Sequence, residues 1–215
     1  MQQLLKNADL SQCSLIMRHG PRLIIEDATK AEQVMLTDEG QVASRQLGAD
    51  LFQHQPPAHI FHSTIARCGQ TAQCMLEGMA HAAHGVENHG GQHRLAACYL
   101  PNNQHTYQYC KDQDMDTLQF IQKWFEGDLS ADLAVPAQGA AQDQLYFMRE
   151  QHEQRGGFQV HVSHDWNMML FIWRYLGLTP SWDVWPSFLE GVLLTWSDDG
   201  VWFRFREHEK KVALA

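Results

Sequence analysis

Three strand-like segments, each followed by a helix-like segment, most constrain what this chain can fold into. The strand-like segments are CSLIMR (13–18), AHIFH (58–62) and FQVHVS (158–163). The first is a continuous apolar run, which is typical of a central strand in a parallel sheet. The segments that follow, 36–54, 64–79 and 166–177, carry apolar residues at helical spacing. Strands that alternate with helices predict an α/β fold with a mostly parallel sheet.

The end and the middle of the chain have different patterns. EGVLLTWSDDGVWFRFRE (190–207) contains two strand-like runs around a turn at Asp198, Asp199 and Gly200, so it predicts an antiparallel hairpin. In the middle, HAAHGVENHGGQH (81–93) is rich in histidine and glycine and is interpreted as a loop. The segments 115–127 and 139–154 are predicted to be helices.

Length and composition favour one domain. With 215 residues, 44% of them hydrophobic, the chain can bury one sizeable core. We expect a single domain over residues 1–215 with a small insertion at about 80–154. No run of about 18 apolar residues occurs, which argues against a membrane-spanning helix. The first 14 residues lack the pattern of a secretory signal, so a cytoplasmic location is expected.

Charge and cysteine content narrow the functional classes further. The formal net charge of -9 makes nucleic acid an improbable partner, because binding to a phosphate backbone needs a basic surface. The five cysteines are odd in number and include no C-x-x-C pair. This argues against a disulfide framework and against a structural zinc site, and it predicts free thiols.

Polar side chains follow each of the three strand-like segments. They are Arg18, His19 and Arg22 after the first, Ser63 and Arg67 after the second, and His164 and Asp165 after the third. In open α/β sheets, ligands bind at the carboxyl ends of the strands. Three clusters at those ends therefore predict a single anion site that is assembled from distant parts of the sequence.

The residue types suggest what the site does. Arginine is always charged, and its planar fork suits phosphate or carboxylate. Two arginines beside His19 disfavour its protonated form, so the imidazole should be neutral and nucleophilic, with an anion held next to it.

Each residue also has a structural alternative. Arg22 can pair with Glu26, Ser63 and Asp165 can cap helices, and His164 can be a core histidine. For Ser63, and for Asn167 two residues after Asp165, the structural and functional interpretations are equally supported. Together, however, the structural alternatives leave the shared location of the clusters unexplained.

The motifs RHGPR (18–22), HSTIARCGQTA (62–72) and VSHDWN (162–167), in this order, resemble the three hallmarks of the histidine phosphatase superfamily. This superfamily includes the phosphoglycerate mutases and the histidine acid phosphatases, and the H-D pair most resembles the acid phosphatase and phytase branch. The resemblance covers the two ends of the chain. It implies a three-layer α/β/α sandwich with a mostly parallel central sheet, a C-terminal antiparallel hairpin and a small helical cap insertion.

The resemblance also implies a role for each matching residue. His19 would be the nucleophile that becomes phosphorylated, and Asp165 would be the proton donor. Arg18, Arg22, Arg67 and His164 would bind the phosphoryl oxygens, with Ser63 as a further phosphate contact. If the arrangement were that of the mutases, Glu87 would be the alternative donor.

The expected activity is therefore hydrolysis of a small phosphorylated substrate through a phosphohistidine, without a cofactor. A mutase-like phosphotransferase that uses the same site, and a catalytically weak phosphate or phosphoprotein binder, are the alternatives. The histidines of the glycine-rich segment, His81, His84, His89 and His93, raise the question of a metal site. Because a glycine-rich loop offers little order, no physiological metal site is expected there.

Overall fold

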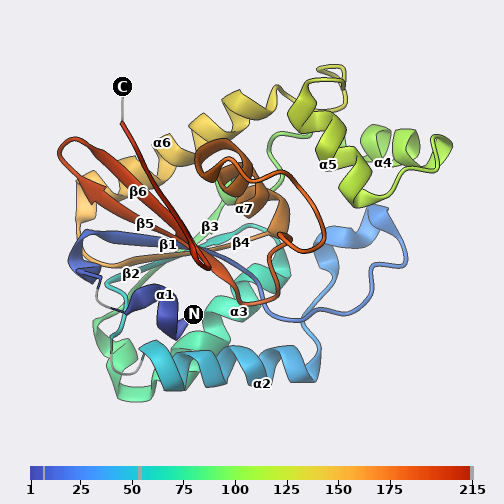
Figure 1. The fold of residues 1–215 in the computed structure, drawn as a ribbon. Coiled ribbons are helices and arrows are strands. Elements are labelled where there is room, and N and C mark those ends of the chain that lie inside the picture. Colours follow the sequence, from blue (N-terminus) through green and yellow to red (C-terminus); the bar gives the residue numbers. More distant parts are fainter. Residues whose placement is uncertain (7, 53–54, 214–215) are drawn as a thin grey trace.

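A seven-stranded mixed sheet forms the centre of the molecule, which we describe from a computed structural model covering residues 1–6, 8–52 and 55–213 (Figure 1). The strand order is β3-β2-β4-β1-β5-β6-β7. The strands are β1 (Cys13–Arg18), β2 (His59–Ser63), β3 (Glu87–Gln92), β4 (Gln159–Ser163), β5 (Gly191–Ser197), β6 (Gly200–Phe205) and β7 (His208–Val212).

The pairing directions agree with the predicted fold class. β1, β4, β2 and β3 pair in parallel, whereas β5, β6 and β7 continue the sheet in antiparallel fashion. The predicted hairpin is confirmed as β5 and β6. It is extended by β7, which was not predicted because its sequence, HEKKV, is mostly polar.

Helices cover both faces of the sheet and produce the predicted three layers (Figure 1). One face carries α2 (Asp38–Leu47) and α3 (Ala66–Met79), and the other carries α6 (Ala137–Arg155) and α7 (Asp165–Phe171). Two buried apolar clusters fill the spaces between the layers. The short α1 (Gln2–Leu5) lies on the same side as α2 in Figure 1.

The local sequence explains where these helices begin. Thr37 is the N-cap of α2, and its Oγ1 accepts a hydrogen bond from the backbone N–H of Gly40 at 3.0 Å. A π-helical turn, Gly48–Phe52, follows α2. The last two residues of the predicted helix, 53–54, lie outside the described residues.

The segment expected to be an insertion is only partly separate from the sheet. β3 and α6 fall within or overlap residues 80–154, yet they form the edge of the sheet and the cover of one face. Between them lie α4 (Asn103–Asp112), which was not predicted, and α5 (Thr117–Glu126), which was. In Figure 1 these two helices lie to one side of the sheet.

The prediction of a loop at residues 81–93 is wrong. Ala80–Gly85 forms a 3₁₀ helix, and Glu87–Gln92 forms strand β3, which pairs in parallel with β2. All six residues of β3 are exposed or half-buried, so the strand has no apolar alternation that a sequence pattern can reveal. Backbone hydrogen bonds to a strand distant in sequence make β3 a strand despite its glycines.

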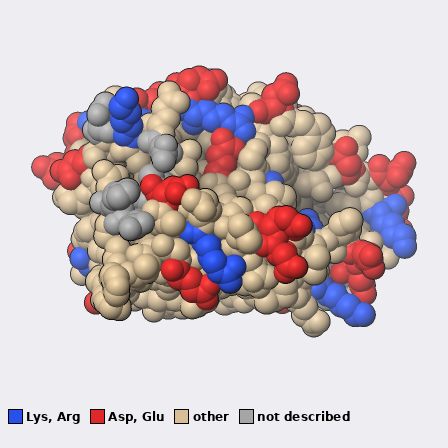
Figure 2. Space-filling view, turned by 90° about the horizontal axis from the view of Figure 1, so that it is seen from below, with Lys and Arg blue, Asp and Glu red and all other residues tan. Residues whose placement is uncertain are grey.

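The described helices include none that is both long and apolar enough to cross a membrane. Figure 2 shows the molecule from below the view of Figure 1, the side on which α2 lies. Acidic and basic side chains are interspersed on this face, and no continuous basic patch is visible there.

Candidate active site

Strand register brings the first and third polar clusters together. β1 and β4 are parallel neighbours, and Arg18 at the end of β1 is directly opposite Ser163 at the end of β4. The backbone N–H of His19 donates to the carbonyl of Ser163 at 3.0 Å. His19 and His164 therefore follow the carboxyl ends of two adjacent parallel strands. Their ring centroids are 5.4 Å apart.

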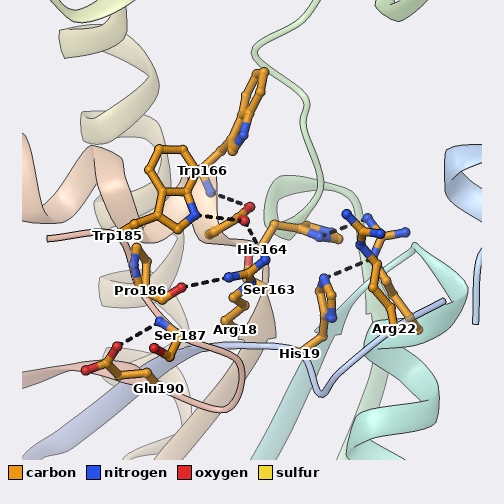
Figure 3. Close-up of polar contacts among 12 residues, drawn as sticks. Arg18, His19, Arg22, Ser163, His164, Trp166, Trp185, Pro186, Ser187 and Glu190 are labelled. Atoms are coloured by element: carbon orange, nitrogen blue, oxygen red, sulfur yellow. Dashed lines mark hydrogen bonds and ion pairs between the residues drawn. The ribbon is translucent and has the colours of Figure 1, made fainter. Parts of the chain in front are cut away.

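His19 is held in one orientation, with its ring nitrogens in different environments (Figure 3). Nδ1 lies 2.7 Å from the carbonyl oxygen of Gly20, an acceptor, so Nδ1 must carry the proton. Nε2 accepts a hydrogen bond from Nε of Arg67 at 3.0 Å and therefore has the lone pair. Burial, followed by the charge of Arg67, lowers the pKa of His19 to about 3. The imidazole is thus neutral at physiological pH.

Arg67 connects the three clusters. It lies in the first turn of α3, which follows directly after β2. Besides its bond to His19, its Nη1 donates to the carbonyl of Ala31 at 2.7 Å, and its Nη2 lies 3.4 Å from Nδ1 of His164. Only 9% of the residue is exposed, so its charge acts in a site of low dielectric.

His164 is the N-cap residue of α7 and is almost completely buried. Because Nδ1 faces the Arg67 guanidinium, which can only donate, Nε2 carries the proton and donates to Oγ of Ser63 at 3.0 Å. Burial and the charge of Arg67 hold the pKa of His164 well below its usual range. Ser63 is therefore linked to the site through His164.

Arg18 and Asp165 form an ion pair at the same edge. Nη2 of Arg18 lies 2.8 Å from Oδ2 of Asp165, and Nη1 donates to the carbonyl of Pro186 at 2.7 Å. The Asp165 carboxylate also accepts from the backbone N–H of Trp166 at 3.0 Å and from Nε1 of Trp185 at 3.1 Å. Asp165 is thus the first residue of α7 and, at the same time, part of the polar cluster.

Arg22 stands on the other side of His19 from Arg18 in Figure 3. It is half-buried, its backbone forms an isolated antiparallel bridge with Leu36, and its Nη1 donates to the carbonyl of Leu23 at 2.8 Å. Among the described residues, no hydrogen bond or ion pair joins Arg22 to Glu26. Arg18, Arg22 and Arg67 all contribute positive charge at His19.

The structure thus brings all seven predicted site residues to the carboxyl ends of the parallel strands. It places two other candidates, Asn167 and Glu87, elsewhere. Asn167 is buried and donates to the carbonyls of Leu95 and Ala96 and to Oγ of Ser163, which is a structural role. Glu87 is opposite His59, the first residue of β2, whereas the polar cluster follows Ser63, the last residue of β2. Glu87 therefore lies at the wrong end of the sheet to donate a proton there.

The sequence indicates that the loop TPSWDVWPS (179–187) contributes to specificity, but no residue of this loop was predicted to be part of the site. Pro186 and Trp185 fix Arg18 and Asp165, as described above, and the guanidinium carbon of Arg18 lies 4.0 Å from the centre of the Phe188 ring. Phe188 also lies 5.7 Å from His19, ring to ring, and is 37% exposed. This loop has no helical or strand periodicity, so only its high aromatic content could have drawn attention to it.

Residues 14–90 match the family model described as histidine phosphatase superfamily (branch 1). The likeness of the H-D pair to the acid phosphatase and phytase branch is not confirmed by this match. No curated protein matches the chain.

Several solved structures share the fold. A mycobacterial glucosyl-3-phosphoglycerate phosphatase has a TM-score of 0.61 at 16% identity, with 85% of this chain and 89% of that chain covered. The protein histidine phosphatase SixA, complexed with tungstate, has a TM-score of 0.52 at 14% identity, with 93% and 96% covered. The protein YhfR of Bacillus stearothermophilus has a TM-score of 0.61 at 14% identity, with 90% and 95% covered.

At these identities the structural likeness establishes the fold alone. The match to the family model adds sequence information, because residues 14–90 include Arg18, His19, Arg22 and Arg67. The same fold extends over nearly the whole chain, including the strand that places His164 at the site. Residues 14–90 therefore match the histidine phosphatase superfamily (branch 1), and the chain shares the fold of the solved structures named above.

Proposed function

We propose that this protein is a phosphatase that hydrolyses a small phosphomonoester through a phosphohistidine on His19. One observation carries the proposal: a neutral imidazole has its unprotonated Nε2 next to the Arg67 guanidinium, and Arg18 and Arg22 add further positive charge at His19. The hydrogen bond from Nδ1 to the Gly20 carbonyl fixes the tautomer, and the pKa of about 3 keeps the ring neutral. These are the properties that a nucleophile for phosphoryl transfer needs.

In the first step, Nε2 of His19 attacks phosphorus, and the bond between phosphorus and the ester oxygen breaks. Nε of Arg67 now lies 3.0 Å from Nε2, so this hydrogen bond must pass to a phosphoryl oxygen before attack. The exchange keeps the guanidinium fully bonded and releases the lone pair. Arg18, Arg22 and Arg67 supply the positive charge that stabilises the transferring group, so the proposed mechanism requires no metal ion.

The leaving oxygen needs a proton, and we assign its delivery to Asp165, which must take up a proton from solvent before the ester bond breaks. In the second step, Asp165 accepts a proton from water while the water oxygen attacks phosphorus, which breaks the bond to Nε2 and releases inorganic phosphate. Asp165 is 21% exposed and is placed by Trp166 and Trp185. His164 and Ser63 are the buried polar groups behind Arg67, and in the proposed mechanism the His164 ring would have to exchange its bond with Ser63 for one with a phosphoryl oxygen.

Two relatives in fold support an oxyanion ligand. The mycobacterial glucosyl-3-phosphoglycerate phosphatase is described in complex with VO3, and SixA in complex with tungstate. The cap implied by the resemblance then corresponds to the helices α4 and α5, within one domain spanning the chain, and it would select the substrate together with Phe188. We also propose a cytoplasmic location, which agrees with five unpaired cysteines.

The two alternative functions, a mutase and a binding protein without catalysis, make different demands on the site. A mutase returns the phosphoryl group from His19 to a second hydroxyl of the same substrate, so it must exclude water. Asp165, the proposed base, is 21% exposed, so water can reach it, which favours hydrolysis. A binding protein without catalysis needs neither a fixed His19 tautomer nor a carboxylate near the arginines.

The test is hydrolysis of an aryl phosphate with EDTA present, between about pH 4 and 8, which brackets reference carboxylate and histidine pKa values. The wild type is compared with His19→Ala and with His208→Ala, a control on the exposed strand β7. We expect turnover in the wild type and in the control, none in His19→Ala, and an acid-labile phosphoenzyme that His19→Ala does not form. No turnover of this ester or of a panel of metabolite phosphates, despite tight binding of phosphate, would support the binder instead.

A further inference from the structure

Two histidines and one glutamate meet at the end of the sheet opposite the candidate active site. His59 is the first residue of β2, and Glu87 is its direct partner at the start of β3. His89 is two residues after Glu87, so it is on the same face of the sheet. The active-site end of β2 is Ser63, four residues further along and therefore about 13 Å away.

The three potential ligand atoms form a nearly regular triangle. Nε2 of His89 lies 3.1 Å from Nδ1 of His59, and Oε2 of Glu87 lies 3.5 Å from each of these nitrogens. The point equidistant from all three atoms, in their plane, is about 2 Å from each, which is the length of a zinc–nitrogen or zinc–oxygen bond. The three atoms can thus bind one ion without moving apart or closer.

The cluster is built into ordered structure. The His89 ring stacks on Phe61 with a centroid distance of 4.5 Å and an interplanar angle of 12°, and Phe61 is 1% exposed. The His59 side chain is 12% exposed and that of His89 20%, whereas Glu87 is 70% exposed. Packing therefore holds the imidazoles of His59 and His89 in place. The exposed Glu87 side chain is free to turn toward a bound ion.

We propose that His59, Glu87 and His89 bind one divalent transition-metal ion, with zinc as the best match, and that water completes the coordination. Two imidazoles and one carboxylate are donors that zinc accepts in proteins, and they do not suit magnesium or calcium, which prefer oxygen. Arg155 is a nearby positive charge that opposes the ion.

The position of the site gives it a structural effect. β3 is the edge strand, its pairing with β2 shifts register between Ile60 and His62, and none of its side chains is fully buried. Few apolar contacts hold such a strand in place. An ion bound by one residue of β2 and two of β3 would join the two strands directly. This inference is independent of the proposed phosphatase activity.

The test is zinc binding by the whole protein, stripped of metal with a chelator and titrated in competition with a chromophoric chelator. We expect one equivalent bound by the wild type, affinity lower by more than about 100-fold in His59→Ala, and a smaller loss in the exposed variant Glu87→Gln. The matched control is His81→Ala/His84→Ala, which removes two histidines of the neighbouring 3₁₀ helix and leaves the triangle intact. It should bind like the wild type.

Thermal unfolding provides a second measurement. Zinc should raise the melting temperature of the wild type and of the His81→Ala/His84→Ala control, and it should not raise that of His59→Ala. Circular dichroism of the metal-free variants establishes that each is folded. The proposal is overturned if wild type and His59→Ala bind zinc equally, or if the double variant of His81 and His84 loses the binding.

Discussion

The Arg18 guanidinium and the Asp165 carboxylate form a 2.8 Å ion pair that joins the last residue of β1 to the first residue of α7. The two side chains are 13% and 21% exposed, so water screens their interaction only partly. The pair links the proposed phosphate ligand to the proposed proton donor. Substitutions at these two positions should therefore be non-additive in their effects on activity.

The first prediction concerns Asp165→Asn, which removes the group that protonates the leaving oxygen. We expect kcat for an alkyl phosphate, whose leaving group is poor, to fall by about 10²- to 10⁴-fold. The loss for an aryl phosphate with a good leaving group should be much smaller. Steady-state kinetics with a series of esters measure the difference.

Trp185→Phe is the matched control, because it removes one of the donors to Asp165 and keeps the carboxylate and its ion pair. Its effect should be nearly the same for all esters in the series. An equal loss for good and poor leaving groups in Asp165→Asn would show that Asp165 only positions Arg18.

The second prediction concerns Arg67→Lys. A lysine keeps the charge, but it cannot donate at once to His19, to Ala31 and toward His164, as the guanidinium does. We expect kcat/KM to fall by about 10²- to 10³-fold, as for loss of one oxyanion donor. Inhibition by tungstate should weaken in parallel. Unchanged inhibition together with reduced kcat would mean that Arg67 orients His19 and does not bind the anion.

The polar cluster was predictable because strand ends are predictable. Once Arg18, Ser63 and His164 were assigned to the ends of three parallel strands, the topology required them to meet, and the structure shows that they do. The match of motif order to a known superfamily added the expected identity of the nucleophile. None of this required knowledge of a side-chain rotamer.

The parts that escaped prediction lack periodicity. β3 is stabilised by backbone pairing, with its side chains exposed or half-buried, so its sequence resembles a loop. The Pro186 carbonyl acts through its backbone oxygen, which carries no sequence signal.

The third prediction concerns Arg206, which holds the loop over the site. Its guanidinium donates to both oxygens of Glu190, at 2.7 and 2.9 Å, and to the carbonyl of Trp185 at 3.1 Å. Burial opposes the charge of Glu190, but hydrogen bonds from Arg206 and from the backbone of Ser187 lower its pKa overall. Because Trp185 and Pro186 fix Asp165 and Arg18, loosening this loop should displace both.

We therefore expect Arg206→Gln to lower kcat/KM by about 10- to 100-fold, since small displacements of catalytic groups have effects of this size. The matched control is Arg149→Gln, which removes an exposed pair with Glu153 on α6. It should leave activity unchanged. The fluorescence of Trp185 and neighbouring tryptophans should change in Arg206→Gln alone, and its constancy would contradict the proposed role of the loop.

The fourth prediction concerns stability and uses His161, which plays no part in the proposed chemistry. It is completely buried in β4, and its ring stacks on Phe61 at a centroid distance of 4.7 Å. Neither ring nitrogen has a hydrogen-bond partner among the described residues. Burial is the main reason that the pKa of His161 is lowered to about 3, followed by the nearby His89 and His152.

The direction of the pH dependence follows from this shift. Between pH 6.5 and about 3, the unfolded chain binds a proton at His161 and the folded chain does not, so the free energy of unfolding falls as pH falls. From pH 7 to 5 this one residue should lower it by about 2 kcal/mol. His161→Phe should remove that part of the pH dependence, whatever its effect at pH 7. Urea unfolding at several pH values, with chelator present and with His208→Gln as the control, measures it, and parallel curves for wild type and His161→Phe would contradict the prediction.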